Sequence, residues 1–203
     1  MFNYNSIGTA IKRFFCTIVL LNLISHTVFS ETPLREKDHF PRLSVGSNLL
    51  YLAALAPNVA AEYYFQDSHW SVSATFTMPW WKRKSKHQFY QIRQYLAEGR
   101  YWLNKIPSAK GHFFGCNIHG GIYDLENKKT GYYGDFIGTS LTYGYRFSLN
   151  KKMALELTVG GGYIFSKYDK YVPADKCYMY QSTHKAHYWG ITKAGVSLMW
   201  NIL

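Results

Sequence analysis

The densest basic run in the chain places four cations within five positions, directly after two tryptophans: Lys82, Arg83, Lys84 and Lys86. Clustered cations attract phosphate groups. A run of like charges is also typical of a solvated loop tip. We therefore expect either a solvated tip or a binding site for lipopolysaccharide phosphates.

Six other charged residues lie in segments that hold few other charges: Glu62, Glu98, Arg100, Arg146, Glu156 and Lys193. Three are carboxylates and three are cations. Opposite charges that share a confined space must pair or stay strongly hydrated. If the fold turns them toward one narrow interior, they predict a salt-bridged plug, and the alternative is a path for protons or ions.

Catalytic and metal-binding signals are weak. Ser182, His184 and His187 hold the elements of a nucleophile and a base, and Asp175 and Cys177 lie nearby, but no motif fixes their spacing. We expect no enzyme activity, no cofactor and no metal. The alternative is a barrel enzyme that modifies lipid A or lipopolysaccharide.

The elements that carry these residues read as strands, because apolar and polar residues alternate with a period of two. From Tyr133 to Leu149, the odd positions are mostly large and apolar, while the even positions are mostly Gly, Ser and Thr. Eight segments follow this pattern: 43–52, 57–65, 69–78, 89–103, 111–123, 133–149, 153–166 and 187–202. The connections at 66–68, 104–110 and 150–152 are shorter than those at 79–88, 124–132 and 167–186. This organisation predicts an all-β fold, an eight-stranded antiparallel up-and-down transmembrane β-barrel.

The composition of the two strand faces separates a membrane barrel from a soluble barrel or sandwich. The polar faces carry mainly Gly, Ser, Thr and Asn rather than the many charges of a water-facing exterior. Aromatic residues form 18% of the chain and gather near strand ends, as expected at two membrane interfaces. With a three-residue turn at 150–152, Arg146 falls opposite Glu156.

The first thirty residues predict an export signal. Lys12 and Arg13 precede an apolar run from Phe14 to Ile24, with small residues toward Ser30. A single membrane anchor is the alternative, although the run is shorter than the roughly 20 residues of a helical span. We therefore expect a signal peptide at 1–30, a short periplasmic segment at 31–42 and a barrel at 43–203. This arrangement predicts the outer membrane of a Gram-negative type cell, with both termini periplasmic and no nucleic-acid partner.

Several segments, taken in order, resemble a family of small outer-membrane β-barrels of unknown function. They are 47–51, 57–63, 97–103, 111–115, 143–145, 160–163 and 192–198. The architecture is also similar to that of the OmpA-type eight-stranded barrel. Members of the family often accompany fimbrial genes, so the resemblance implies a structural or surface-assembly role with fimbrial or other surface proteins. It supplies no catalytic residues. The tyrosines of the last long connection form a candidate partner surface: Tyr168, Tyr171, Tyr178 and Tyr180.

Overall fold

The computed structural model describes residues 42–83, 88–105, 110–127, 129–150, 152–174 and 177–202. The expected signal peptide and nearly all of the expected periplasmic segment lie outside these ranges. The side chains of five residues at the ends of the gaps are also not described: Arg83, Pro173, Ala174, Cys177 and Tyr178.

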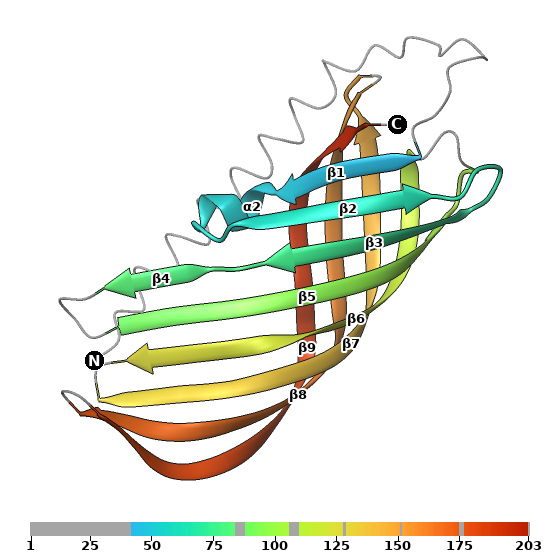
Figure 1. Ribbon diagram of the computed structural model, residues 1–203. Helices are drawn as coiled ribbons and strands as arrows, with labels where there is room; N and C mark the ends of the chain where they lie inside the picture. Colours follow the sequence, from blue (N-terminus) through green and yellow to red (C-terminus); the bar gives the residue numbers. More distant parts are fainter. Residues whose placement is uncertain are drawn as a thin grey trace, which may run out of the picture. The chain divides into compact units, whose positions relative to one another are not determined.

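Eight antiparallel strands form a hydrogen-bonded ring (Figure 1). They are β1 (Leu43–Asn48), β2 (Asn58–Tyr64), β3 (Trp70–Thr77), β5 (Gln88–Trp102), β6 (Gly111–Asn127), β7 (Thr130–Ser148), β8 (Met153–Ala174) and β9 (Cys177–Asn201). Successive members of the ring pair with each other, and β1 pairs with β9 to close it. The predicted eight-stranded antiparallel up-and-down topology is confirmed for this ring.

A ninth strand, β4 (Trp80–Arg83), lies within a segment that the sequence pattern predicts as a loop. It follows β3 after a break at Pro79 and pairs with β5. Proline has no backbone N–H, so it interrupts the hydrogen-bond ladder at this point. The Pro79 carbonyl still accepts a hydrogen bond from the amide of Ile92 at 3.1 Å, which keeps β4 beside β5.

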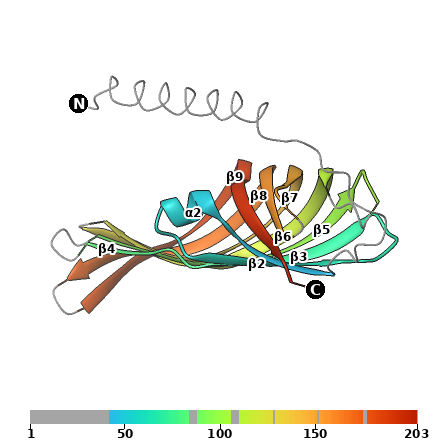
Figure 2. The ribbon, with the colours of Figure 1, turned by 90° about the horizontal axis from the view of Figure 1, so that it is seen from above.

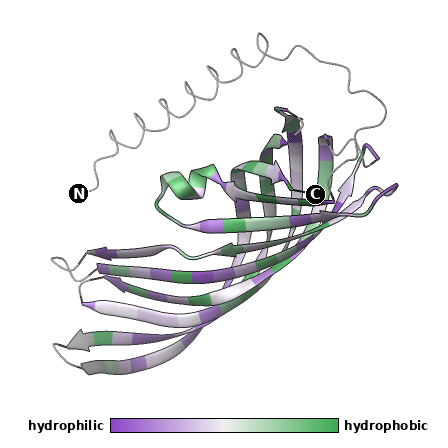
Figure 3. Cartoon of the chain, turned by 45° about the horizontal axis from the view of Figure 1, so that its top comes forward, coloured by the Kyte–Doolittle hydropathy of each residue, from purple (hydrophilic) through white to green (hydrophobic). Residues whose placement is uncertain are grey.

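The two faces of the ring differ in the way that the alternation predicts. Along β7, Gly138, Ser140 and Thr142 are buried, whereas Leu141 and Tyr143 are exposed. Hydrophilic and hydrophobic residues alternate along the strands in Figure 3. The small polar residues therefore face the lumen, and the large apolar residues face outward.

The long connections expected at 79–88, 124–132 and 167–186 are wrong in extent, because strands occupy five of the ten positions at 79–88 and most of the other two connections. Strands β6 and β7 continue to Asn127 and Thr130, and β8 and β9 continue to Ala174 and Cys177. Figure 2 shows these ends leaving the ring on the left as an open sheet, which we call the extension. Its two edges are β4 and the first part of β9, because β1 pairs with β9 only at 197–201.

The strand predicted at 43–52 is also too long, because β1 ends at Asn48 and a short helix follows, α2 (Leu49–Ala53). The Asn48 side chain caps this helix by accepting a hydrogen bond from the Leu50 amide at 3.0 Å. The helical segment is rich in Leu and Ala, which are strong helix formers. The connection between β1 and β2 therefore carries a helical cap instead of a short loop. No helix among the described residues is long and apolar enough to cross a membrane.

The polarity of the sheet inverts where the ring passes into the extension. One outward row across β5 to β9 is mostly charged: Arg93, Ile122, Asp135, Lys167 and Lys185. The next outward row toward the ring is mostly apolar: Tyr95, Gly120, Ile137, Phe165 and His187. We call the charged row the boundary row, because the outward face is apolar on one side of it and polar on the other.

Candidate functional site

Four charged side chains meet inside the ring: Glu62 of β2, Arg100 of β5, Arg146 of β7 and Glu156 of β8. Arg100 Nη1 lies 3.0 Å from Glu62 Oε2 and 3.1 Å from Glu156 Oε2. Arg146 Nη2 lies 2.5 Å from Glu62 Oε2 and 2.6 Å from Glu156 Oε2. Arg146 stands directly opposite Glu156 in the β7–β8 register, so these two come from neighbouring strands. Glu62 and Arg100 reach them from the other side of the lumen.

The two remaining charges join the same group. Arg100 Nε donates to Glu98 Oε2 at 2.6 Å, and Lys193 Nζ donates to both oxygens of Glu98 at 3.0 and 2.9 Å. The structure thus brings all six expected residues into one network, which we call the lumen charge cluster. It holds three carboxylates and three cations, and Glu62 is fully buried. The cluster is formally neutral, which buried charges require if none is to remain uncompensated.

Three buried aromatic side chains cover the lumen charge cluster on the side of the short turns: Tyr64, Trp102 and Phe113. The Arg100 guanidinium lies over the Phe113 ring at 4.7 Å, and the Arg146 guanidinium lies over the Trp102 ring at 4.7 Å. Arg146 also donates to the Tyr64 hydroxyl. The alternation pattern does not distinguish these three aromatic residues from the others, although each occupies an inward position of its strand.

Little free space remains between the cluster and α2. A cavity of about 50 Å³ lies there, and its lining includes Arg100, Glu156 and Tyr51 of α2. This volume holds one or two water molecules. Burial raises the pKa of the Tyr51 hydroxyl, so this side chain stays neutral at the lumen mouth. The geometry suits a plug rather than a continuous water-filled path.

The basic run lies on the hairpin between β4 and β5, and the structure describes only part of it. Lys82 Nζ lies 5.0 Å from the centre of the Phe89 ring, over its face. Arg83 is described through its backbone, which pairs with Gln88, and Lys84 and Lys86 lie outside the described residues. Of the four basic side chains expected to bind phosphate, the structure therefore describes one, the exposed Lys82, which lies over an aromatic ring.

The residues with catalytic potential lie on the exposed edge strand β9. Ser182 Oγ is 2.7 Å from His184 Nε2, and His187 Nδ1 is 2.6 Å from the Tyr163 hydroxyl. Ser182 therefore lies beside a potential base, His184, whereas His187 contacts Tyr163 instead of Ser182. No carboxylate among the described residues hydrogen-bonds to His184, so no orienting third group completes the pair. The described residues also hold no group of three His, Cys, Asp or Glu that suits a metal ion.

The candidate tyrosine surface does not gather on one face. Tyr168 stacks on His184 with ring centres 5.5 Å apart, and Tyr132 packs edge-on against Tyr168 at 5.7 Å. Tyr171 is instead buried and donates to Asp124 Oδ1 at 2.5 Å. Tyr180 is exposed near the tip, and the side chain of Tyr178 is not described.

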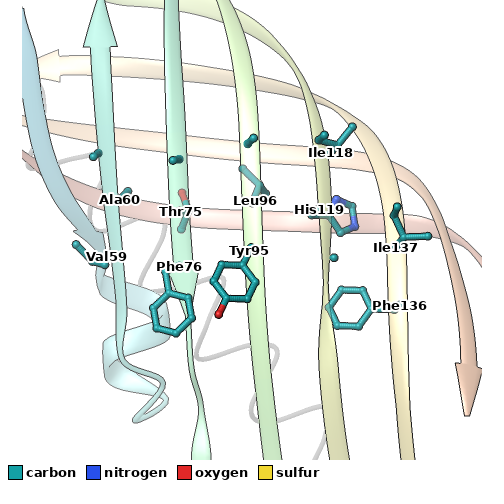
Figure 4. A pocket seen from close by; sticks show the side chains of 14 residues that line it. Val59, Ala60, Thr75, Phe76, Tyr95, Leu96, Ile118, His119, Phe136 and Ile137 are labelled. Carbon is teal, nitrogen blue, oxygen red and sulfur yellow. The ribbon is translucent and has the colours of Figure 1, made fainter.

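An apolar hollow of about 620 Å³ lies on the outward side of β2, β3, β5, β6 and β7 (Figure 4). Three alanines that stand in one row form its floor: Ala61, Ala74 and Ala97. Phe76 and Tyr95 border it, with ring centres 5.1 Å apart. We call it the outer hollow. Its lining suits hydrocarbon rather than a polar ligand.

These features define an all-β protein whose strands close around a charge-paired lumen. A family model described as protein of unknown function, DUF3575, matches residues 16–202, and the chain belongs to this family. No curated protein and no solved structure matches the chain. The expected membership of a family of unknown function is confirmed, and the match assigns no activity.

Proposed function

We propose that the protein is a non-enzymatic outer-membrane β-barrel with a plugged lumen and a structural or surface-interaction role. In this proposal residues 1–30 are removed on export, both termini of the mature chain are periplasmic, and the extension stands outside the cell. The architecture is of the OmpA type. The family resemblance supports a link to fimbrial or surface assembly, with surface proteins, outer-membrane lipid and lipopolysaccharide as partners.

The outward apolar band below the boundary row carries the proposal. On β8 it runs from Leu155 to Phe165, ten steps along the strand. At about 3.4 Å per residue and a tilt of about 40°, this gives a height of roughly 26 Å. The apolar band of outer-membrane barrels is about 25 Å tall. Large exposed residues fill this band, with Leu141 70% exposed and Trp189 76% exposed. Such a surface is costly in water and favourable in lipid.

Heat-modifiable gel migration of the membrane fraction tests the proposal. A small membrane barrel stays folded in detergent until it is boiled, so we expect the unboiled protein to migrate differently from the boiled protein. Identical migration would contradict the proposal.

A matched pair of variants separates lipid from water on the outward face. Leu141→Arg places a charge in the apolar band, whereas Tyr133→Arg places one beyond the boundary row; both side chains are exposed. In a bilayer, a charge near the midplane costs about 2–4 kcal/mol, and near the interface about 0–1 kcal/mol. We expect only Leu141→Arg to reduce the heat-modifiable fraction. Equal behaviour of the two variants would favour a soluble barrel.

One observation favours a second candidate, a lipid A or lipopolysaccharide-modifying enzyme. Ser182 Oγ and His184 Nε2 share a hydrogen bond, and a histidine in this position can activate a serine hydroxyl as a nucleophile by accepting its proton. The mass of lipid A tests it. A mass that changes on overexpression of the native chain, but not of the Ser182→Ala variant, would support the enzyme over the structural role.

A further inference from the structure

The inward face of the extension carries a second apolar hollow, which the proposed role leaves unused. This inner hollow has a volume of about 490 Å³, and its lining includes Ile92, Tyr123, Phe136, Ile164 and Tyr168. These residues come from β5, β6, β7 and β8. The volume lies within the range of roughly 300–1,000 Å³ that is typical of small-molecule sites.

The apolar character of this face is an inversion rather than a continuation of the lumen. Deeper in the ring, the same faces of β5, β7 and β8 carry Arg100, Arg146 and Glu156, each of which is buried. In the extension they carry large apolar side chains, while the outward side carries charges such as Asp135 and Lys167. An apolar concave surface with a polar outside is the usual arrangement of a binding site that opens to water.

The charges along the hollow have one sign. Lys170 stands opposite Tyr132 in the β7–β8 register, and Tyr132 lines the hollow. Paired residues of antiparallel strands project on the same side, so Lys170 belongs to the inward face, as does His184, which stacks on Tyr168. Residues that stand opposite one another on β5, β6, β7, β8 and β9 form a row across the sheet. Four inward rows line or border the hollow: residues 96, 119, 138, 164 and 188; residues 94, 121, 136, 166 and 186; residues 92, 123, 134, 168 and 184; and residues 90, 125, 132, 170 and 182. Among these described residues there is no Asp or Glu.

A second copy of the chain does not fit this charge pattern. Both edges of the extension are basic, with Lys82 on β4 and Lys185 on β9. Lys167 adds a further exposed cation on the outward side. Copies that meet edge to edge through the extension would therefore bring like charges together, which opposes association.

We infer that the inner hollow binds a single-chain anionic amphiphile, a fatty carboxylate, with its hydrocarbon chain over Ile92, Phe136 and Ile164 and its carboxylate beside Lys170. β4 and the first part of β9 are not paired with each other, so the extension is open along these two edges. The inference rests on the proposed function for its placement outside the bilayer.

The test uses the mature protein in lipid nanodiscs and a photoreactive C16 carboxylate, with the C16 alcohol and acetate as comparison ligands. Crosslinks mapped by mass spectrometry are expected on the inward strand positions around Ile92 and Ile164, and palmitate is expected to compete. The alcohol is expected to bind about two- to fivefold more weakly than the carboxylate, and acetate not to compete. Crosslinks confined to outward residues such as Leu141 would overturn the inference, because they report ordinary contact with bilayer lipid.

Two matched pairs of variants test where the hydrocarbon chain and the carboxylate group of the ligand bind. Ile164→Gln on the inward face should weaken carboxylate binding about tenfold, whereas Ile122→Gln on the outward face should change it less than about twofold. Lys170→Gln should weaken the carboxylate about two- to fivefold without affecting the alcohol, and Lys167→Gln should affect neither. Equal effects within either pair would overturn the site. If Ile164→Gln does not fold, Ile92→Gln replaces it.

Two further readouts keep the possible failures apart. Heat-modifiable migration of every variant reports the barrel itself, so a folded barrel that fails to bind contradicts only the amphiphile site. Crosslinks between two copies of the chain at the hollow, if palmitate does not displace them, would show a polypeptide occupant and overturn the inference.

Discussion

Replacing Glu62 with glutamine removes a fully buried carboxylate from the lumen charge cluster while keeping the shape of the side chain. Glu62 Oε2 lies 3.0 Å from Arg100 Nη1 and 2.5 Å from Arg146 Nη2, and Glu62 Oε1 accepts from Ser71 Oγ at 2.6 Å. Glu62→Gln leaves the cluster with three cations and two carboxylates. Removing one partner of a buried ion pair costs about 3–5 kcal/mol, because the remaining charge is uncompensated. We expect the free energy of unfolding to fall by this amount.

Urea unfolding in lipid vesicles, followed by tryptophan fluorescence, measures this loss. Asp135→Asn is the matched control, because Asp135 is exposed on the boundary row and its loss should change the free energy of unfolding by less than about 0.5 kcal/mol. The double variant Glu62→Gln with Arg146→Gln is formally neutral again. We expect it to cost less than the sum of the two single variants by about 1–3 kcal/mol. Additive costs, or a Glu62→Gln variant as stable as the control, would refute a charge-paired plug.

Three other predictions concern packing, orientation and the closed lumen. Gly144→Ala should lower the free energy of unfolding by about 1–3 kcal/mol, because a Cβ there would clash with Phe113 Cζ. Gly99→Ala, whose Cβ would meet nothing within 4 Å, should be neutral in the same urea assay. In a Cys177→Ser background, the exposed thiol of Cys116 on the outward face should resist a charged maleimide in vesicles and react after unfolding; rapid labelling before unfolding would place Cys116 in water. The mature protein in planar bilayers should conduct no measurable current, since a steady conductance would require a path through the lumen charge cluster.

The sequence predicts the ring well, because period-two alternation reports directly which residues face inward. It places Leu141 outward and Thr142 inward, and the three-residue turn at 150–152 predicts the observed pairing of Arg146 with Glu156. That pair depends only on one hairpin. The contacts of Glu62 with Arg100 and Arg146 cross the lumen, so they depend on closure of the ring and on its radius. The alternation along a single strand predicts neither the closure of the ring nor its radius.

The extension is the part that the sequence pattern misreads, and the cause is the inversion of polarity. The prediction assumes that apolar residues face outward along a whole strand, so Phe136 and Ile164 count as exceptions to the pattern. In the structure both residues line the inner hollow, where the inward face is apolar. Exceptions that fall in adjacent inward rows of neighbouring strands are therefore a usable signal for a change of environment. The helix α2 is missed for another reason, because its cap depends on the single side chain of Asn48.

The two halves of the sheet constrain each other's role. In the proposed function, the lumen charge cluster closes the ring, and the cavity above it has a volume of only about 50 Å³. In that case a molecule in the inner hollow would meet a closed floor, and it would leave toward the outside or along the unpaired edges of the extension. Transport through the barrel would thus require the lumen charge cluster to open, whereas binding in the inner hollow would leave it closed. Opening the cluster would have to break several buried ion pairs at once, whereas binding in the hollow requires none of them to move. This difference favours a surface role, in which the ring fixes the extension at the membrane and the extension makes the contacts.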